Sequence, residues 1–307
     1  MVDSLPVQFA LLDAAMRRIP VLAGANPSSA IRLGGLTNVN YRISNNGEEF
    51  VIRIPGVGTS EYINRKAEQV AAYSAATAGV NAEVLFFDVT DGLMLTRFVA
   101  NSVTMTPDRF KDLGAVARAG HALHDLHSKA SKFSGDFKLF PAIDEYRELL
   151  QRKNAPLPDG YEMMQNRIDA TRTALESRRF EMVPSHCDPL CENFLDTGER
   201  MYIIDFEYSG NNDPMWDIGD LSVEGGFTEQ QDKVLVGAYF GSSVTNTELG
   251  RMVAYKAMCD VLWSLWGMVQ HANNNPVEDF WAYANGRFAR CRELMLRPNY
   301  NEHLDNI

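Results

Sequence analysis

Residues that could carry out chemistry are concentrated between positions 185 and 219. His186, Asp188 and Asn193 stand close together in the chain, a short apolar run follows, and Asp205 comes directly after that run. Magnesium-assisted phosphoryl transfer needs a base for the attacking hydroxyl group and hard oxygen ligands for the metal ion. The pattern therefore predicts Asp188 as the base, with Asn193 and Asp205 as ligands of Mg²⁺.

The step of five residues from Asp188 to Asn193 equals the Asp-to-Asn step of a kinase catalytic loop. The alternative is a polar turn between two strands, where Asp and Asn are common because their side chains bond to the backbone. His186 before the loop, and Asp-Phe-Glu at residues 205–207 after an apolar strand, favour the catalytic interpretation.

The segments HCDPLCENFL and YIIDFEYSGNNDPMWDIGDL resemble the choline and ethanolamine kinases, within the wider group of aminoglycoside phosphotransferase-like kinases. The resemblance implies an α+β, two-lobed protein-kinase-like fold that binds ATP and Mg²⁺ between its lobes. It also implies phosphoryl transfer to the hydroxyl group of choline or a close amino alcohol. In this family the base is at the position of Asp188, the metal ligands are at Asn193 and Asp205, and we expect His186 to shape the loop.

Other functions remain open at this point. Ethanolamine, thiamine and aminoglycosides are alternative acceptors within the same superfamily. A pseudokinase that binds nucleotide without catalysis is the alternative from a different class, although all three catalytic-loop positions are filled. The stretch GTSEYINRKAE at residues 58–68 resembles the bacterial choline kinases most.

The composition indicates an ordinary globular protein. The chain has 307 residues, of which 45% are hydrophobic and 22% charged, and its formal net charge is −11. That charge argues against a nucleic-acid partner and fits a small cationic substrate. There is no basic leader before an apolar core and no long apolar stretch, so we expect a cytoplasmic protein. The four cysteines lack C-x-x-C spacing, and a zinc site is not favoured: Cys187, Cys191, Cys259 and Cys291.

The first part of the chain is predicted to form a five-stranded antiparallel sheet with one helix. After an amphipathic helix at 6–19, β-branched and aromatic alternation indicates strands at 31–33, 39–43, 50–54, 82–87 and 93–98, and a helix at 62–78. We therefore expect a nucleotide-binding lobe at residues 1–98. A mostly helical lobe for catalysis and acceptor binding follows at residues 99–307.

A phosphate-binding loop is predicted where paired glycines lie between two strands. Glycine lets a phosphate approach the backbone closely, and the nucleotide-binding residues of this loop are Gly34, Gly35, Thr37 and Asn38. A plain hairpin turn is the alternative for the glycines.

Arg53 lies on the strand after this loop, where a cation could reach the phosphates as the strand lysine does in protein kinases. The family commonly has arginine in this context. Glu68, on the following helix, could hold Arg53 through a bidentate pair. The alternatives are a solvated arginine and a surface glutamate.

Helical patterns dominate the second part of the chain. Helices are expected at 107–127, 142–153, 159–178, 214–224, 228–240, 246–271 and 276–296. His121, His124 and His127 lie near one face of the first of these. Packing of this helix under the catalytic loop is favoured over a metal site, because no acidic partner completes a known motif.

The acceptor site is predicted from aromatic residues. Trp263 and Trp266 are three apart on one helix face, and aromatic rings recognise quaternary ammonium groups. Without context, two such tryptophans are more often core residues. The family has a similar F-W-x-L-W-x-x-x-Q helix that lines the choline site, which implies an acceptor role here. By the same resemblance, Tyr208, Glu224 and Tyr283 are acceptor residues.

The sequence departs from the eukaryotic members of the family directly after Glu224, one of the predicted acceptor residues. Gly225, Gly226 and Phe227 stand where those members usually have Glu-Trp and a nearby tyrosine. A smaller or differently closed pocket is therefore expected.

Overall fold

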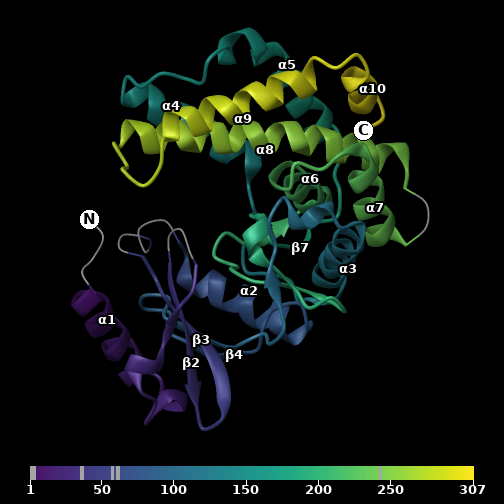
Figure 1. The fold of residues 1–307 in the computed structure, drawn as a ribbon. Coiled ribbons are helices and arrows are strands. Elements are labelled where there is room, and N and C mark those ends of the chain that lie inside the picture. Colours follow the sequence, from purple (N-terminus) through teal and green to yellow (C-terminus); the bar gives the residue numbers. More distant parts are fainter. Residues whose placement is uncertain (1–4, 35–37, 57–58, 60–62, 242–243) are drawn as a thin grey trace.

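The computed structural model describes residues 5–34, 38–56, 59, 63–241 and 244–307. Gly35 and Thr37, both predicted in the phosphate loop, lie outside these residues. The fold is α+β, as predicted. An antiparallel sheet occupies the N-terminal part, and a mainly helical part follows (Figure 1).

Among the described residues, the N-terminal sheet has five strands. In spatial order they are β1 (Ile31–Arg32), β2 (Val39–Asn45), β3 (Glu48–Ile54), β5 (Met94–Arg97) and β4 (Val84–Phe87), with every neighbouring pair antiparallel. The β2–β3 hairpin closes on Asn46 and Gly47, whose φ angles are 51° and 80°. Positive φ at both central residues matches the twist of the flanking strands.

A helix packs on each face of this sheet. Helix α1 (Leu5–Arg17) contributes Leu12, Ala15 and Met16 to a core shared with alternate residues of the strands, including Phe50 and Ile52 of β3. Successive side chains of a strand point to opposite faces. Arg53 therefore points away from α1 and toward α2 (Arg65–Thr77), which begins three residues later than predicted.

Short strands hold the catalytic loop. Strand β7 (Val183–Ser185) pairs with β10 (Gly210–Asn212), and β8 (Phe194–Asp196) pairs with β9 (Met201–Ile203) and with β6 (Val103–Thr104). The apolar strand before Asp205 was predicted, whereas β6, β7 and β10 were not. Each has two or three residues, too few for a recognisable pattern of alternation.

The predicted helices are present with small shifts in their bounds. They are α3 (Leu113–Lys129), α4 (Leu139–Arg152), α5 (Tyr161–Glu176), α6 (Pro214–Glu224), α7 (Glu229–Phe240), α8 (Asn246–Ala272) and α9 (Phe280–Met295), to which the structure adds α10 (Tyr300–Asp305). The start of the predicted helix 107–127 is instead a turn of 3₁₀ helix at Arg109–Lys111. Within the described residues, no helix is long and apolar enough to cross a membrane.

Helix α8 lies at the centre of the helical part. Most of its side chains are buried, and it contacts α4, α6, α9 and α10. Figure 1 shows α8 and α9 lying alongside each other at the end of the molecule opposite the sheet. Capping boxes fix the first turns of α7 and α8, where Thr228 pairs with Gln231 and Thr245 with Glu248.

Close contact between α3 and α7 depends on Gly120, because a Cβ atom there would lie 2.6 Å from the carbonyl oxygen of Leu235. Gly120→Ala should lower the free energy of unfolding by about 1–3 kcal/mol, the usual cost of overpacking. Urea denaturation measures this change. Gly237→Ala, on α7 with nothing within 4 Å of the new atom, is the matched control. It should leave stability unchanged or raise it by up to about 1 kcal/mol. Equal stability of both variants would contradict the packing argument.

Candidate active site

The predicted catalytic residues converge on one loop. Asn193 ends a short 3₁₀ turn, and its side-chain Nδ2 donates a hydrogen bond to the carbonyl oxygen of Asp188 at 3.0 Å. The amide orientation is thereby set, and Oδ1 is left as the atom that could bind a cation. The backbone N–H of Ile204 donates to the carbonyl of Asn193 at 2.9 Å, which ties the loop to the segment that leads to Asp205.

Asp188 carries the chemically distinctive carboxylate of this loop. The residue is half-buried, and its carboxylate accepts no hydrogen bond from any residue in the described ranges. The pKa of Asp188 is raised to about 8, first by burial and then by the nearby carboxylates of Glu224, Asp205 and Glu207, against the opposing charge of Arg287. A carboxylate with a raised pKa and a free oxygen suits a proton acceptor.

A buried carboxylate from α6 holds the loop from below. Asp217 accepts hydrogen bonds from the backbone N–H of His186 at 2.7 Å and of Cys187 at 2.9 Å. Cys187 has a φ of 68°, a left-handed conformation that is unfavourable for a side chain other than glycine. The two bonds to one carboxylate, with a third from Trp216 Nε1 to the carbonyl of Cys187, stabilise that conformation. This role of Asp217 was not predicted from the sequence.

The histidines of α3 do not converge on one point. His127 is buried and its Nε2 lies 3.0 Å from Asp217 Oδ2, whereas His121 and His124 are exposed. Helix α3 therefore packs under the catalytic loop, as the favoured interpretation required.

His186 links the loop to the strand that precedes Asp205. Its imidazole is fully buried, with Nε2 2.9 Å from the carbonyl oxygen of Ile204 and the ring in edge contact with Phe206. These contacts fit the expected role of shaping the loop, and they leave the ring away from solvent.

Arg53 connects the sheet to this loop. Its guanidinium forms an ion pair with Glu68 and donates to Asp205 Oδ1 at 3.1 Å. Both Arg53 and Glu68 are buried, so the alternatives of a solvated arginine and a surface glutamate are wrong. Asp205 itself has a φ of 68°, which indicates a conformation imposed by its surroundings.

Two further residues of this charged group were missed. Arg65 of α2 forms ion pairs with Glu68 at 2.7 Å and with Glu207 at 3.5 Å. One carboxylate oxygen from each of Glu68, Asp205 and Glu207 lies within 4.8 Å of the others. Glu68 is buried and paired with both arginines, whereas the Asp205 side chain is 30% exposed, so Asp205 is the one of these three that best fits a hard ligand of a magnesium ion.

The described residues of the predicted phosphate loop lie at the edge of this group. Asn38 is buried, and its Nδ2 donates to Glu207 Oε2 at 3.3 Å. At Gly34 a Cβ atom would meet nothing within 4 Å. The backbone there is accessible, which is what close approach of a ligand needs.

The predicted acceptor residues form one row of aromatic rings. Ring centroids are 6.2 Å apart between Tyr208 and Trp263, 6.1 Å between Trp263 and Trp266, and 5.9 Å between Trp266 and Tyr283, each pair edge to face. Trp263 is 9% exposed and also belongs to the main core, so the core alternative holds for part of its surface. Trp266 and Tyr283 are half-buried.

A chain of charges borders this aromatic row. Glu224 pairs with Arg287 at 2.5 Å, and the Arg287 guanidinium lies 4.9 Å from the ring centroid of Tyr283. Asp260 of α8 accepts from both Arg287 and Arg290. Neither Arg287 nor Asp260 was predicted from the sequence. Arg287 lies four residues after Tyr283 on α9, a spacing that places both on one helix face.

The departure at residues 225–227 ends α6 directly after Glu224. Gly226 has a φ of 60°, and the Phe227 ring covers Gly225 so closely that a Cβ atom there would clash with it. Phe227 packs against Phe110 with ring centroids 5.3 Å apart. This aromatic side chain therefore belongs to the core.

Comparisons with known proteins agree with this geometry. The family model of choline/ethanolamine kinase matches residues 30–235. Protein LicA of Haemophilus influenzae is 29% identical over 271 residues, which are 86% of this chain and 78% of the relative.

Two solved structures show the same architecture. A choline/ethanolamine kinase family protein from Mesorhizobium loti has a TM-score of 0.89 at 50% identity and covers 96% of this chain and 98% of its own. The choline kinase LicA from Streptococcus pneumoniae has a TM-score of 0.76 at 25% identity and covers 92% and 98%. The chain therefore belongs to the choline/ethanolamine kinase family and is a small-molecule kinase.

Proposed function

We propose that this protein transfers the γ-phosphoryl group of ATP, with Mg²⁺, to the hydroxyl group of choline or a close amino alcohol. The observation that carries the proposal is the position of Asp188 between two groups of side chains. The charges of Asp205 and Glu207, which pair with Arg53 and Arg65, act on its carboxylate, and so do those of Glu224 and Arg287 beside Tyr283. The base is thus within electrostatic reach both of the proposed metal ligand Asp205 and of the charges that border the aromatic row.

The side chains around Arg53 and Asp205 would hold the nucleotide. Asn193 Oδ1 and the Asp205 carboxylate are the proposed ligands of Mg²⁺, which would neutralise charge on the phosphates when bound. Arg53 would bind the phosphates, held in orientation by Glu68. Gly34, Gly35, Thr37 and Asn38 would contribute the phosphate loop. We accordingly assign nucleotide binding to residues 1–98 and acceptor binding to residues 99–307.

The aromatic row and Glu224 at its border would hold the acceptor. Aromatic faces attract an ammonium group, and Trp263, Trp266, Tyr208 and Tyr283 offer several such faces in one row. Glu224 adds a negative charge at its border. With the ammonium held there, the acceptor hydroxyl would donate its proton to Asp188 as its oxygen attacks the γ-phosphorus, and ADP would leave.

The first test is turnover with a panel of choline, ethanolamine, thiamine and an aminoglycoside. We expect ATP-dependent phosphorylation of the amino alcohols. Asp188→Asn should lower kcat by about a hundredfold or more, the scale of general-base catalysis, while ATP binding measured by calorimetry stays intact. Asp196→Asn, which removes a carboxylate of β8 that pairs with Arg118 of α3, should keep its turnover. Near-normal turnover of Asp188→Asn would refute the assignment of the base.

The metal site is tested by Asp205→Ala. Loss of this carboxylate should abolish magnesium-dependent activity, because it is a hard ligand next to the phosphates. Activity titrated with Mg²⁺ is the measurement. Asp108→Ala removes an exposed carboxylate that pairs with Lys111, and it should leave the titration unchanged. An unchanged titration for Asp205→Ala would make Asp205 structural.

The aromatic row is tested by Trp263→Leu and Trp266→Leu. Each removes a ring face, and desolvated cation–π contacts are worth about 2 kcal/mol, so the apparent affinity for choline should weaken by roughly thirtyfold. The KM for ATP should change far less. Because Trp263 also packs in the core, its variant should lose more thermal stability than Trp266→Leu.

Trp281→Leu serves as the control for these two variants, since Trp281 is exposed on α9 and contacts His271. It should change neither the choline KM nor the Tm. A large loss of stability with an unchanged choline KM in both test variants would mean that the two tryptophans are core residues only.

A further inference from the structure

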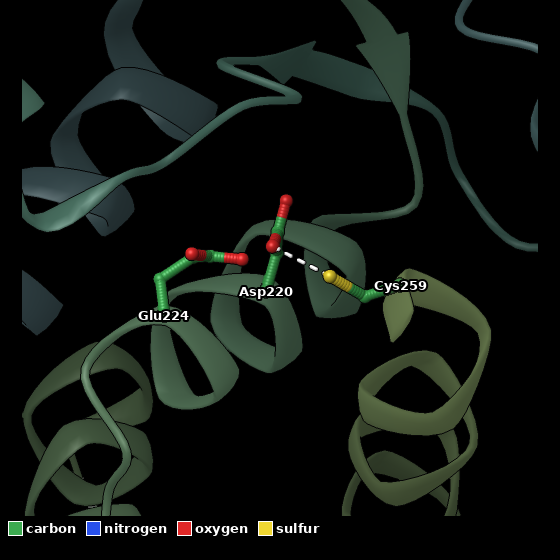
Figure 2. Close-up of side chains that lie close together, drawn as sticks. All are labelled: Asp220, Glu224 and Cys259. Carbon is green, nitrogen blue, oxygen red and sulfur yellow. Dashed lines mark hydrogen bonds between the residues drawn. The ribbon is translucent and has the colours of Figure 1, made fainter. Parts of the chain in front are cut away.

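Three side chains from α6 and α8 lie close together next to the aromatic row. One ligand-type atom from each of Asp220, Glu224 and Cys259 lies within 4.8 Å of the others. Figure 2 shows the Asp220 carboxylate between the Glu224 carboxylate and the Cys259 thiol. The thiol donates a hydrogen bond to Asp220 Oδ1 at 2.7 Å, so one oxygen of Asp220 has a partner.

The second carboxylate oxygen of Asp220, Oδ2, has no hydrogen-bond partner among the described residues. Asp220 is 1% exposed, and Oδ2 is buried. Glu224 and Asp260 differ in this respect, because both pair with Arg287. A buried acceptor without a donor is costly, and such atoms are rare enough in folded proteins to need an explanation.

Asp220 lies next to the proposed acceptor site. The charges of Glu224, Asp188 and Arg287 act on its carboxylate, and Arg287 lies over the ring of Tyr283. Burial and the charge of Glu224 raise the pKa of Asp220 well above its usual range, so the ionised form that accepts a hydrogen bond is favoured when a cation binds beside it. The Glu224 side chain keeps 12% of its surface exposed, so this member of the cluster is in contact with solvent.

We propose that Asp220 Oδ2 accepts a hydrogen bond from an N–H of the acceptor ammonium group, so that this site favours amino alcohols that retain an N–H over trimethylated choline. The inference rests on the proposed function and narrows its substrate class. Aromatic faces attract methylated and unmethylated ammonium groups alike. Of these two kinds of ammonium group, only the one with an N–H can donate to Oδ2, and a site with a buried acceptor discriminates against a ligand that leaves it unpaired.

A metal ion fits this cluster less well. Glu224 is already held by Arg287, whose positive charge opposes a second cation on the same carboxylate. Cys259 is a donor to Asp220 and therefore carries its proton, and burial raises the pKa of this thiol well above its usual value. Metal binding requires the thiolate, so the surroundings of Cys259 disfavour it.

The experiment compares four acceptors that differ by single methyl groups: ethanolamine, N-methylethanolamine, N,N-dimethylethanolamine and choline. The decisive step is the last, where the final N–H is lost. In the natural protein, kcat/KM should fall about tenfold or more at this step, the range expected for a charged hydrogen bond. A natural protein that uses choline as well as N,N-dimethylethanolamine would overturn the proposal.

Asp220→Asn should reduce the difference in kcat/KM between N,N-dimethylethanolamine and choline. Because Cys259 donates to one oxygen position, the amide should turn its oxygen to the thiol and present its NH₂ group in place of Oδ2. The ratio of the kcat/KM values for N,N-dimethylethanolamine and choline should then fall about tenfold. If this variant does not fold, Asp220→Ala, which removes the oxygen, gives the same comparison. An unchanged ratio in a folded variant would overturn the proposal.

Glu224→Gln is the matched control, one helical turn away on α6. Its carboxylate already has a cationic partner, so the change should weaken all four acceptors alike and keep the ratio within about twofold. If none of the four acceptors is bound or phosphorylated, the proposed function fails and the inference with it. If they are phosphorylated and the ratio of the kcat/KM values is the same in Asp220→Asn as in the natural protein, only the inference fails.

A metal test completes the design. A rise in the Tm of the natural protein with added Zn²⁺, lost in both Asp220→Asn and Cys259→Ala, would assign the cluster to a metal ion and overturn the proposal. No Zn²⁺-dependent rise is expected.

Discussion

The active-site geometry depends on one buried carboxylate. Asp217 accepts the consecutive N–H groups of His186 and Cys187, and it meets His127 on its other side. It joins α6 and α3 to the residue directly before the proposed base. Cys187 adopts a left-handed conformation that would otherwise be unfavourable, and this turn sets the direction in which Asp188 leaves the loop. Helix packing and catalytic geometry are therefore coupled through a single side chain.

Two buried arginines organise the charges on either side of that base. Arg53 binds Glu68 and Asp205 on the side of the sheet, and Arg287 binds Glu224 on the side of the helices. Burial and the charges of Glu224, Asp205 and Glu207, which outweigh the charge of Arg287, raise the pKa of Asp188. An excess of buried negative charge disfavours the empty site and favours cationic ligands. The same imbalance thus supports both the metal ion and the ammonium group of the proposed reaction.

Local patterns made much of the fold and part of the site predictable. The Asn46-Gly47 turn, the alternation along β3 and the spacing of Asp188 and Asn193 all act over a few residues, so the sequence expresses them directly. The hydrogen bond between Asp220 and Cys259 joins residues 39 apart in the chain. It depends on how α6 lies against α8, a tertiary relation that periodicity does not specify. The role of Arg287 was missed for the same reason, since it requires α9 beside α6.

Helix α8 both fills the core and borders the proposed acceptor site. Its buried residues fill the centre of the helical part, and Cys259, Trp263 and Trp266 on the same helix border the proposed acceptor site. A substitution on α8 that reshapes the pocket also disturbs the core, so changes in substrate preference through this helix come at a loss of stability. Tyr283 on α9 is half-buried and contacts the same aromatic row from the outer side. Divergence among relatives in acceptor choice should therefore accumulate on α9 while α8 stays nearly constant.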